Sequence, residues 1–507
     1  MNIKTSPFLF TIIMSLVIPT LLFFTNKQPV SHNASAANFD EARYNSIMTV
    51  NYAPYDGMKV DGIVKNLNGD PLAAYVRIFN LLRTPNHVDV VAQAYANING
   101  EFSIDMPIGK NPGEYEVIIY RGPEYEFFSQ LVDIQAGMTA SLDVSLARIA
   151  DMAADGWYGG DVHQHSRQVS PGYGSDGSQT MEQMAEADVA MGLHFAAQTD
   201  HNQTVSAGNE RFIAEGSRYS LDSGDLKFLP IAGNEVTTSA GHFNAWDPTQ
   251  NSGYYAVNTY VDTSGMETRV ADIFRIAQDM REHSLLSVIN HPNAQLTLEQ
   301  MGSPGGMSYV VSDLDWMEYK DLTLSFDAVE MWNGGNGFMT SPEGIFGSIP
   351  YFGTENDPAH WDIPESKHLT FFNWYKLLNS GVRFPGVGSS DSHNRNGVLE
   401  SGMYDQLIAG VRAATGGYLP VFDSPPAAVA AIGRLVGVEG ALMYYLKDNA
   451  EHATENMATL PGMPRNYVYL GNEAFSPENL AQAIKDGRSF ITNGPMLKAE
   501  INGRIAR

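Results

Sequence analysis

Short groups of polar residues, each at or just past the end of a short apolar run, constrain the fold of this chain more than any other feature. Residues 193–197 form such a run before Asp200, and residues 285–289 form another before His291. Apolar runs of this length predict buried β-strands. Because a barrel of parallel strands collects the ends of its strands on one face, we expect these polar groups to lie close together.

Two of the groups each carry a pair of candidate ligands that stand two residues apart, His163 with His165 and Asp391 with His393. Residues i and i+2 of a strand point to the same face, so each pair can act on one site. The groups between them add histidine and carboxylate side chains at predicted strand ends: Asp200, His201, Glu235, His242 and His291. A single histidine of this kind is more often structural than a ligand, but six histidines with three carboxylates predict a metal site.

The chain has no cysteine, which excludes disulfides and leaves nitrogen and oxygen side chains as the metal ligands. Histidine and carboxylate ligands suit Zn²⁺, Mn²⁺ or Fe²⁺ and do not choose among them. Two or three such ions at close spacing can lower the pKa of bound water to about 7 and produce hydroxide without a protein nucleophile. The predicted reaction is therefore hydrolysis.

The chain of 507 residues has a formal net charge of −26, which argues against a general affinity for nucleic acid or an anionic membrane. Residues 7–24 are an apolar run, and Ala34-Ser35-Ala36 has the pattern of a cleavage site. Residues 1–36 are therefore predicted to be a signal peptide or an uncleaved N-terminal anchor, followed by a linker over residues 37–56. We expect export to the periplasm or the extracellular space, and no other run is long and apolar enough to span a membrane.

Residues 57–150 are predicted to form a small all-β sandwich, because short runs rich in Val, Ile, Tyr and Phe alternate there with turn sequences. Asn68-Gly69 and Asn99-Gly100 are examples of such turns. The segment also resembles the carboxypeptidase-regulatory, transthyretin-like domains. It carries no catalytic set, so we interpret it as a packing or adhesion module whose partner is unknown.

From residue 155 to residue 500, predicted strands alternate with predicted helices, which indicates a mostly parallel sheet and most simply a barrel. Thr180 and Gln183 form a predicted capping box before one helix, and Ser476-Pro477 begins another near the end. Residues 297–366 and 396–470 are rich in Gly, Pro, Met and aromatic residues. We interpret them as insertions near the strand ends that shape a pocket.

Taken in order, the polar groups resemble the motifs of the polymerase-and-histidinol-phosphatase (PHP) metallohydrolases. The resemblance covers about residues 156–497 and rests on Asp161-Val162-His163-Gln164-His165-Ser166, Ser175-Asp176-Gly177, Thr199-Asp200-His201-Asn202, Glu235, Asn290-His291-Pro292 and Ser390-Asp391-Ser392-His393. Three further features resemble the CehA/McbA branch: the segment from Glu235 to His242, Glu330, and Thr492-Asn493-Gly494-Pro495. The resemblance implies an α/β fold, a distorted (β/α)7 barrel, that holds two or three divalent metal ions.

The resemblance also implies a ligand set. One ion would be bound by His163, His165, Glu235 and Asp391. Glu235 would bridge to a second ion completed by His242 and His291. A third ion would use His201 and His393, with Asp176 where many relatives place a histidine or an aspartate. An insertion over residues 167–174 lengthens the usual gap before Asp176 in this sequence.

Four further residues are candidates for catalysis or its support: Asp200, Glu330, Arg167 and Arg395. Asp200 is interpreted as a partner that orients a histidine, rather than as a ligand. Glu330 would support a ligand, face the substrate or simply cap a strand end. Arg167 and Arg395 lie beside metal motifs, and arginine commonly recognises phosphate, although each also has a plainer interpretation as a surface residue.

These observations favour a phosphoesterase that acts on a small-molecule ester, with carboxyl-ester or aryl carbamate hydrolysis on the same metal centre as the alternative. A non-catalytic exported binding protein is a further alternative, although none of the expected ligand positions is blank. The amidohydrolase superfamily also begins with His-x-His, but Asp200-His201 and the histidine two residues after Asp391 disfavour it.

Overall fold

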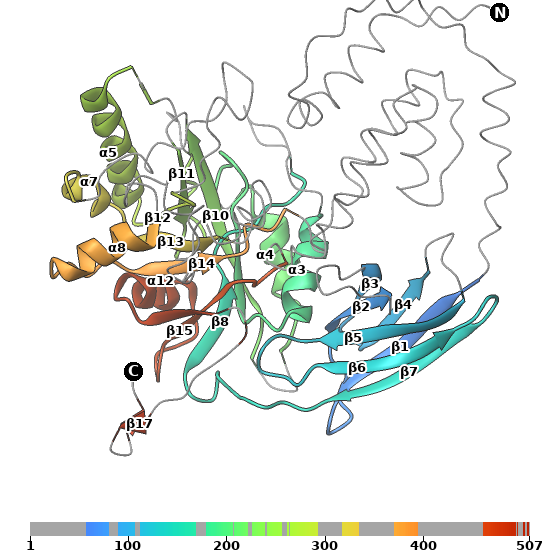
Figure 1. Ribbon diagram of the computed structural model, residues 1–507. Coiled ribbons are helices and arrows are strands. Elements are labelled where there is room, and N and C mark those ends of the chain that lie inside the picture. Colours follow the sequence, from blue (N-terminus) through green and yellow to red (C-terminus); the bar gives the residue numbers. More distant parts are fainter. Residues whose placement is uncertain are drawn as a thin grey trace, which may run out of the picture.

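The computed structural model shows two parts packed together, a unit of short strands and a larger α/β sheet with its helices (Figure 1). It describes residues 57–80, 90–106, 112–168, 179–205, 207–221, 226–238, 241–255, 261–262, 264–292, 317–333, 370–393, 460–492, 494, 500–501 and 504–505. The predicted signal or anchor segment and the linker therefore lie outside the described residues. Of the helices that are described, none combines the length and apolarity needed to span a bilayer.

Seven strands form the smaller part, which we call the β unit: β1 (Lys59–Asn66), β2 (Ala74–Asn80), β3 (Val90–Ala96), β4 (Glu101–Asp105), β5 (Gly113–Tyr120), β6 (Phe128–Ile134) and β7 (Thr139–Leu146). One sheet has the order β4-β1-β7 and the other has the order β3-β2-β5-β6. Buried and exposed residues alternate along β4, as expected for a strand with one face in a core. Val60, Val117 and Val144, which come from both sheets, belong to one apolar core. The two sheets therefore pack face to face.

Nine strands form the large sheet: β8 (Trp157–Asp161), β9 (Phe195–Gln198), β10 (Leu229–Thr238), β11 (Gly241–Trp246), β12 (Leu286–Ile289), β13 (Ala328–Asn333), β14 (Gly386–Ser389), β15 (Arg465–Tyr469) and β16 (Ser489–Thr492). Their order is β14-β13-β12-β11-β10-β9-β8-β15-β16. β11 and β15 run antiparallel to their neighbours, and all other neighbouring pairs are parallel. Every residue of β9 and β12 is buried, which is typical of parallel strands covered on both faces. A separate two-stranded sheet joins β17 (Glu500–Ile501) and β18 (Arg504–Ile505).

The described helices lie between successive strands of the large sheet: α3 (Met181–Ala190), α4 (Glu210–Gly216), α5 (Met266–Glu282), α7 (Lys320–Thr323), α8 (Thr370–Asn379) and α12 (Pro477–Lys485). α3 begins at the predicted capping box, in which the Thr180 hydroxyl and the Gln183 side chain each accept the other residue's backbone N–H. α12 begins at Ser476, with Pro477 in its first turn. The predicted α/β fold class is confirmed for the described residues, but the large sheet is mixed rather than mostly parallel, with four parallel and four antiparallel neighbouring pairs.

Two strands of the large sheet lie inside the segments that the sequence predicted as insertions. β13 falls within residues 297–366, and β15 falls within residues 396–470. Gly334-Gly335 follows β13, and Pro461-Gly462-Met463-Pro464 precedes β15, so loop-like sequence beside each strand obscured it. Most of the other residues of both predicted insertions lie outside the described part of the chain.

The ends of β8 and β14 meet, although five strands separate them in the sheet order. Just past these strands, Asp391 N donates to His163 O over 3.0 Å, and His165 N donates to Ser392 O over 2.8 Å. Gln164 and Ser392 form a parallel β-bridge between the same two segments. The first and last pairs of predicted ligands are thereby brought together.

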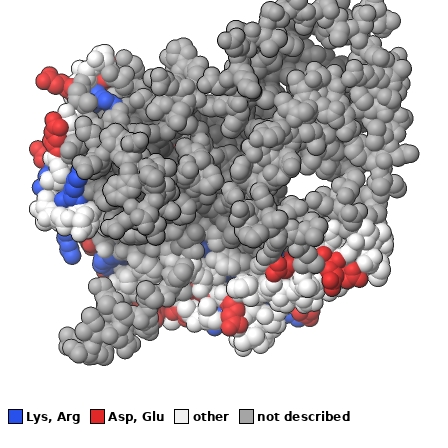
Figure 2. All heavy atoms as spheres, in the orientation of Figure 1, with Lys and Arg blue, Asp and Glu red and all other residues white. Residues whose placement is uncertain are grey.

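Charged side chains are unevenly placed on the face shown in Figure 2. Asp and Glu side chains gather over the described residues of the β unit, whereas both charges are mixed over the helices around α5 and α8. Within this view, the described Lys and Arg side chains are interspersed with acids and form no continuous basic patch.

Candidate metal centre

The structure brings together all the predicted metal ligands that it describes: His163, His165, His201, Glu235, His242, His291, Asp391 and His393. Glu235 lies within β10 and His242 lies in β11, the antiparallel strand beside it, and the others lie just past the ends of β8, β9, β12 and β14. Each of four overlapping groups offers three ligand atoms within 4.8 Å of one another: His165, His201 and His393; His163, His291 and Asp391; His163, His165 and Glu235; His201, Glu235 and His242. Asp176 and Arg395 lie outside the described residues.

Glu235 lies at the middle of this site. Its two carboxylate oxygens lie between 2.9 and 3.4 Å from ring nitrogens of five histidines: His163, His165, His201, His242 and His291. The Glu235 side chain is 1% exposed, so water does not screen these contacts. Glu235 therefore belongs to two of the four ligand groups, one with His163 and His165 and one with His201 and His242.

Asp391 forms the second carboxylate of the site. Its Oδ1 atom is 3.3 Å from His163 Nε2 and 3.2 Å from His165 Nε2, and these two nitrogens are 3.0 Å apart. Oδ1 is buried and accepts no hydrogen bond from the described residues. A buried oxygen of this kind is costly to leave without a partner. A cation bound by the three atoms would satisfy it, so the residues present suit a divalent ion.

The carboxylates and imidazoles of the site each favour the charged form of the other. Burial raises the pKa of Glu235, but nearby imidazoles, His242 first among them, outweigh burial and hold that pKa well below its ordinary value. Burial lowers the pKa of His163, but the carboxylates of Asp391 and Glu235 outweigh it and hold that pKa well above its ordinary value. The carboxylates therefore attract positive charge into the site, which either protons on the imidazoles or divalent ions can supply.

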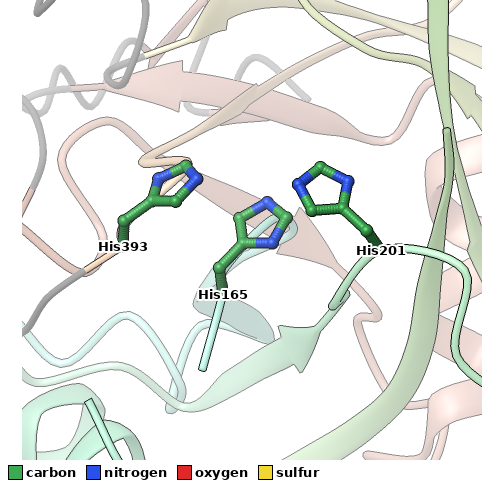
Figure 3. A group of neighbouring side chains, drawn as sticks. All are labelled: His165, His201 and His393. Carbon is green, nitrogen blue, oxygen red and sulfur yellow. The ribbon is translucent and has the colours of Figure 1, made fainter. Parts of the chain in front are cut away.

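The rings of His165, His201 and His393 form one of the ligand groups (Figure 3). The His165 ring lies between the other two, with ring centroids 4.6 Å from His201 and 4.4 Å from His393. The His393 side chain is 37% exposed, whereas those of His165 and His201 are 1% and 3% exposed. A small molecule would therefore reach the ligands from the side of His393.

Glu330 supports two of the ligands. Its Oε1 atom is 3.0 Å from His163 Nδ1, and its Oε2 atom accepts from His291 N over 2.6 Å and from Asn333 Nδ2 over 2.7 Å. Ser389 also donates to this carboxylate. A carboxylate on Nδ1 fixes a histidine with Nε2 directed at the ion. Of the three roles considered for Glu330, its contacts fit that of a residue that supports His163.

Asp200 acts on the backbone next to a ligand. Its two oxygens accept from the backbone N and the hydroxyl of Ser166, each over 2.6 Å, and Ser166 directly follows His165. Asp200 thus fixes the chain beside this histidine, and it belongs to none of the four ligand groups. Arg167 is exposed, and its backbone N donates to Gln179 O over 2.8 Å.

The sequence did not assign roles to several residues that hold the ligands. Asn290 Nδ2 donates to Glu235 Oε1 over 2.7 Å, and Asn333 Nδ2 donates to Asp391 Oδ2 over 3.1 Å. Both asparagines stand close to predicted site residues at strand ends, and this position in the sequence could have identified them as part of the site. Asn290 and Asn333 therefore orient the two carboxylates of the site.

Three residues of the site have left-handed backbone conformations. The φ angles are 49° at Asn202, 23° at His291 and 50° at Asp391. Non-glycine residues in this region cost about 1–3 kcal/mol each and are common at functional sites. The fold therefore holds these side chains in place against a local backbone preference.

No protein-family model matches this chain, and a search of curated proteins finds no match. Among solved structures, the chain is similar to a two-domain protein containing a predicted PHP-like metal-dependent phosphoesterase from Bacteroides vulgatus ATCC 8482. That similarity has 13% identity and a TM-score of 0.32, and covers 67% of this chain and 66% of that chain. A proposed metal-dependent phosphoesterase from Bifidobacterium adolescentis ATCC 15703 shows 14% identity and a TM-score of 0.25, over 46% of this chain and 87% of that chain. Similarities this low carry no argument about activity, so function is argued from the site.

Proposed function

We propose that this chain is an exported metal-dependent hydrolase of the PHP superfamily, CehA/McbA type, that acts on small-molecule phosphoesters. The large sheet would form the distorted (β/α)7 barrel of that superfamily, and the β unit would be its sandwich domain. One observation carries the proposal: the Glu235 carboxylate lies within 3.4 Å of ring nitrogens of five histidines. Buried imidazole and carboxylate groups in this arrangement suit two or three divalent ions.

The residues around the centre would hold these ions and protect the reaction. Bound divalent ions would polarise an ester oxygen and lower the pKa of water to about 7. Glu330 orients His163, and Asn290 and Asn333 orient the two carboxylates. Burial of His163 and Glu235 keeps bulk water away from the inner side, while the exposed His393 leaves an approach for substrate.

The phosphoester assignment rests on the resemblance and on residues near the open side. Arg167 is exposed and stands two residues after His165, and arginine commonly recognises phosphate. Carboxyl-ester or aryl carbamate hydrolysis on the same centre remains the alternative substrate class. Export rests on the apolar run over residues 7–24.

The first experiment compares substrate classes on metal-loaded protein. Zn²⁺, Mn²⁺ or Fe²⁺ is added to the purified chain, which is assayed with p-nitrophenyl phosphate mono- and diesters, a naphthyl carbamate and a carboxyl ester. His163→Ala/His165→Ala should abolish turnover, whereas His283→Ala, at an exposed histidine after α5, should not. Metal-dependent phosphate ester cleavage lost only in the double variant supports the proposal. Turnover of only the carbamate or carboxyl ester moves the assignment to the alternative, and bound metal without any turnover favours a binding protein.

A further inference from the structure

Residues 460–467, which lead into and begin β15, form a segment that we call the linking segment. Leu460 and Met463 are buried in one apolar cluster with Tyr75 of the β unit and with residues of α3. The Tyr467 hydroxyl donates to Glu124 Oε1 over 3.1 Å, and Glu124 lies between β5 and β6. The linking segment is therefore fastened to the β unit by apolar burial and by a buried hydrogen bond.

The same segment is fastened to the strands that carry the metal ligands. Gly462 N donates to Asp161 Oδ2 at the end of β8 over 2.7 Å. Asn466 Oδ1 accepts from Gly388 N in β14 over 2.8 Å, and Asn466 Nδ2 donates to Gly388 O over 2.5 Å. A shift of the linking segment would therefore act on β8 and β14 together.

Asp161 connects the linking segment to the backbone beside the ligands. Its Oδ1 atom accepts from His163 N over 3.3 Å and from Ser390 N over 3.1 Å. Its Oδ2 atom accepts from Gly462 N over 2.7 Å and from Gln164 Nε2 over 3.1 Å. Asp161 is fully buried, so these donors satisfy the carboxylate where water would do so at the surface. One carboxylate thus joins the backbone of His163, the residue before Asp391, and the linking segment.

We propose that the linking segment, through Asp161, is a positioning element that makes the β unit a structural part of the metal centre. Asp161 acts on His163 and Asp391 through their backbone and is not itself a ligand. On this account the binding partner of the β unit is the large sheet of the same chain. The inference rests on the proposed metal centre, and it adds a role for a part of the molecule that carries no catalytic set.

Asp161→Asn tests the role of the carboxylate with little change in volume. Both oxygens of Asp161 face N–H donors, so an asparagine amide in either orientation directs its NH₂ group at another donor. The variant should keep its fold while loosening the backbone of His163 and Ser390. Outer contacts of this kind typically change metal affinity by about 10- to 100-fold.

Asp188 provides a matched control. It is buried like Asp161 and also accepts from Gln164 Nε2, over 2.7 Å, through its Oδ1 atom. Its Oδ2 atom has no hydrogen-bond partner among the described residues, so an asparagine can direct its carbonyl at Gln164 and its NH₂ group away. Asp188 makes no described hydrogen bond with the linking segment or with the backbone of a ligand, and it acts on Arg465 of that segment only through charge. Asp188→Asn should therefore retain metal within about twofold of the wild type.

The experiment measures metal retention, independently of any substrate. The full chain is loaded with Zn²⁺, titrated with EDTA and desalted, and bound zinc is counted by mass spectrometry. Asp161→Asn should lose zinc at an EDTA concentration about 10- to 100-fold lower than the wild type, with Asp188→Asn unchanged. Equal retention by Asp161→Asn and the wild type, or equal loss by both variants, overturns the positioning role. Failure of the wild type to bind zinc, manganese or iron overturns the proposed function itself.

A second variant keeps the inference testable if Asp161→Asn does not fold. Tyr467→Phe removes only the hydroxyl that contacts Glu124. Tyr467 stands 74 positions after His393, the nearest proposed ligand in the sequence. Because one hydrogen bond contributes about a factor of five, zinc retention should fall about two- to fivefold. Tyr158→Phe, whose ring stacks on Phe475, is the control and should not change retention. Unchanged retention in Tyr467→Phe shows that the β unit does not support the metal centre.

Discussion

Ile119 of the β unit and Glu235 of the metal centre are buried to almost the same degree, with 0% and 1% of their surfaces exposed. Ile119 lies in a core of apolar side chains, whereas Glu235 lies among five imidazoles. Burying Ile119 is favourable by itself, at roughly 25 cal/mol per Å² of apolar surface. Burying Glu235 is unfavourable unless positive charge is brought to it. Burial therefore has a different energetic consequence in the two regions, and only the second region requires positive charge, which protonated imidazoles or divalent ions can supply.

The largest effect is expected when the charge at the centre is removed. Glu235→Gln keeps the size of the side chain but abolishes the carboxylate that contacts five histidines. Metal retention should fall by more than about 100-fold, beyond the range of outer contacts, and hydrolysis should fall with it. Chelator titration with mass spectrometry measures the loss. Glu210→Gln, at an exposed residue of α4, is the control, and equal retention in both variants would contradict a bridging role for Glu235.

A change inside the apolar core of the β unit, away from the cluster that packs on the linking segment, should alter stability without altering the metal centre. Ile119→Ala leaves a cavity in an apolar core and should lower the free energy of unfolding by about 2–5 kcal/mol. Ile149→Ala, at a side chain that is 61% exposed, should change it by less than about 0.5 kcal/mol. Denaturant unfolding measures both, and zinc bound per folded molecule should equal that of the wild type. Ile119 does not belong to the cluster that packs on the linking segment, so loss of zinc from folded Ile119→Ala would show that the metal centre depends on the core of the β unit as well.

The orientation of one ligand provides a smaller test. Glu330→Gln removes the charge behind His163 Nδ1 and should weaken metal retention by about 10- to 100-fold, equivalent to about 1.4–2.7 kcal/mol. The global fold should be retained, because the glutamine side chain is close in volume to the original. Chelator titration again measures the effect. Retention equal to that of the wild type would return Glu330 to the role of a substrate-facing or capping residue.

The effect of pH on the stability of the metal centre should depend on whether metal is bound. The pKa of His163 is held well above its ordinary value of 6.5, so without metal its proton stabilises the folded state below that pH. This contribution should be lost as pH rises through the folded pKa, by about 1.4 kcal/mol for each unit of the shift. With metal present, the trend should reverse, because rising pH removes the protons that compete for the imidazoles. Thermal unfolding with and without Zn²⁺ from pH 6 upward measures this, and parallel curves would argue against metal binding at these histidines.

The amino-acid sequence predicted which polar side chains come together better than it predicted what holds them in place. His163 and Asp391 could be placed because strand ends are local features, visible as polar residues after apolar runs, whereas Glu235, predicted at a strand end, lies within β10. The contact of Asp161 with Gly462 joins residues 301 positions apart, and no local pattern indicates such a pair. The same limit applies to strand direction: β11 and β15 run against their neighbours, and pairing direction depends on distant parts of the chain.

The smallest effect is expected at a residue whose sequence character is misleading. Leu67 is apolar but 72% exposed, at the tip of a turn that Asn66 holds by accepting from Asn68 N and Asp70 N, each over 2.9 Å. Leu67→Ser should change the free energy of unfolding by less than about 0.5 kcal/mol, whereas Asn66→Ala should lower it by about 1–3 kcal/mol. Denaturant unfolding of the two variants compares them directly. A loss of more than 1 kcal/mol in Leu67→Ser, about twice the limit for such surface changes, would mean that another part of the chain covers this turn. Leu67 would then be stabilised by apolar contact, as Ile119 is, rather than left exposed at the tip of the β unit.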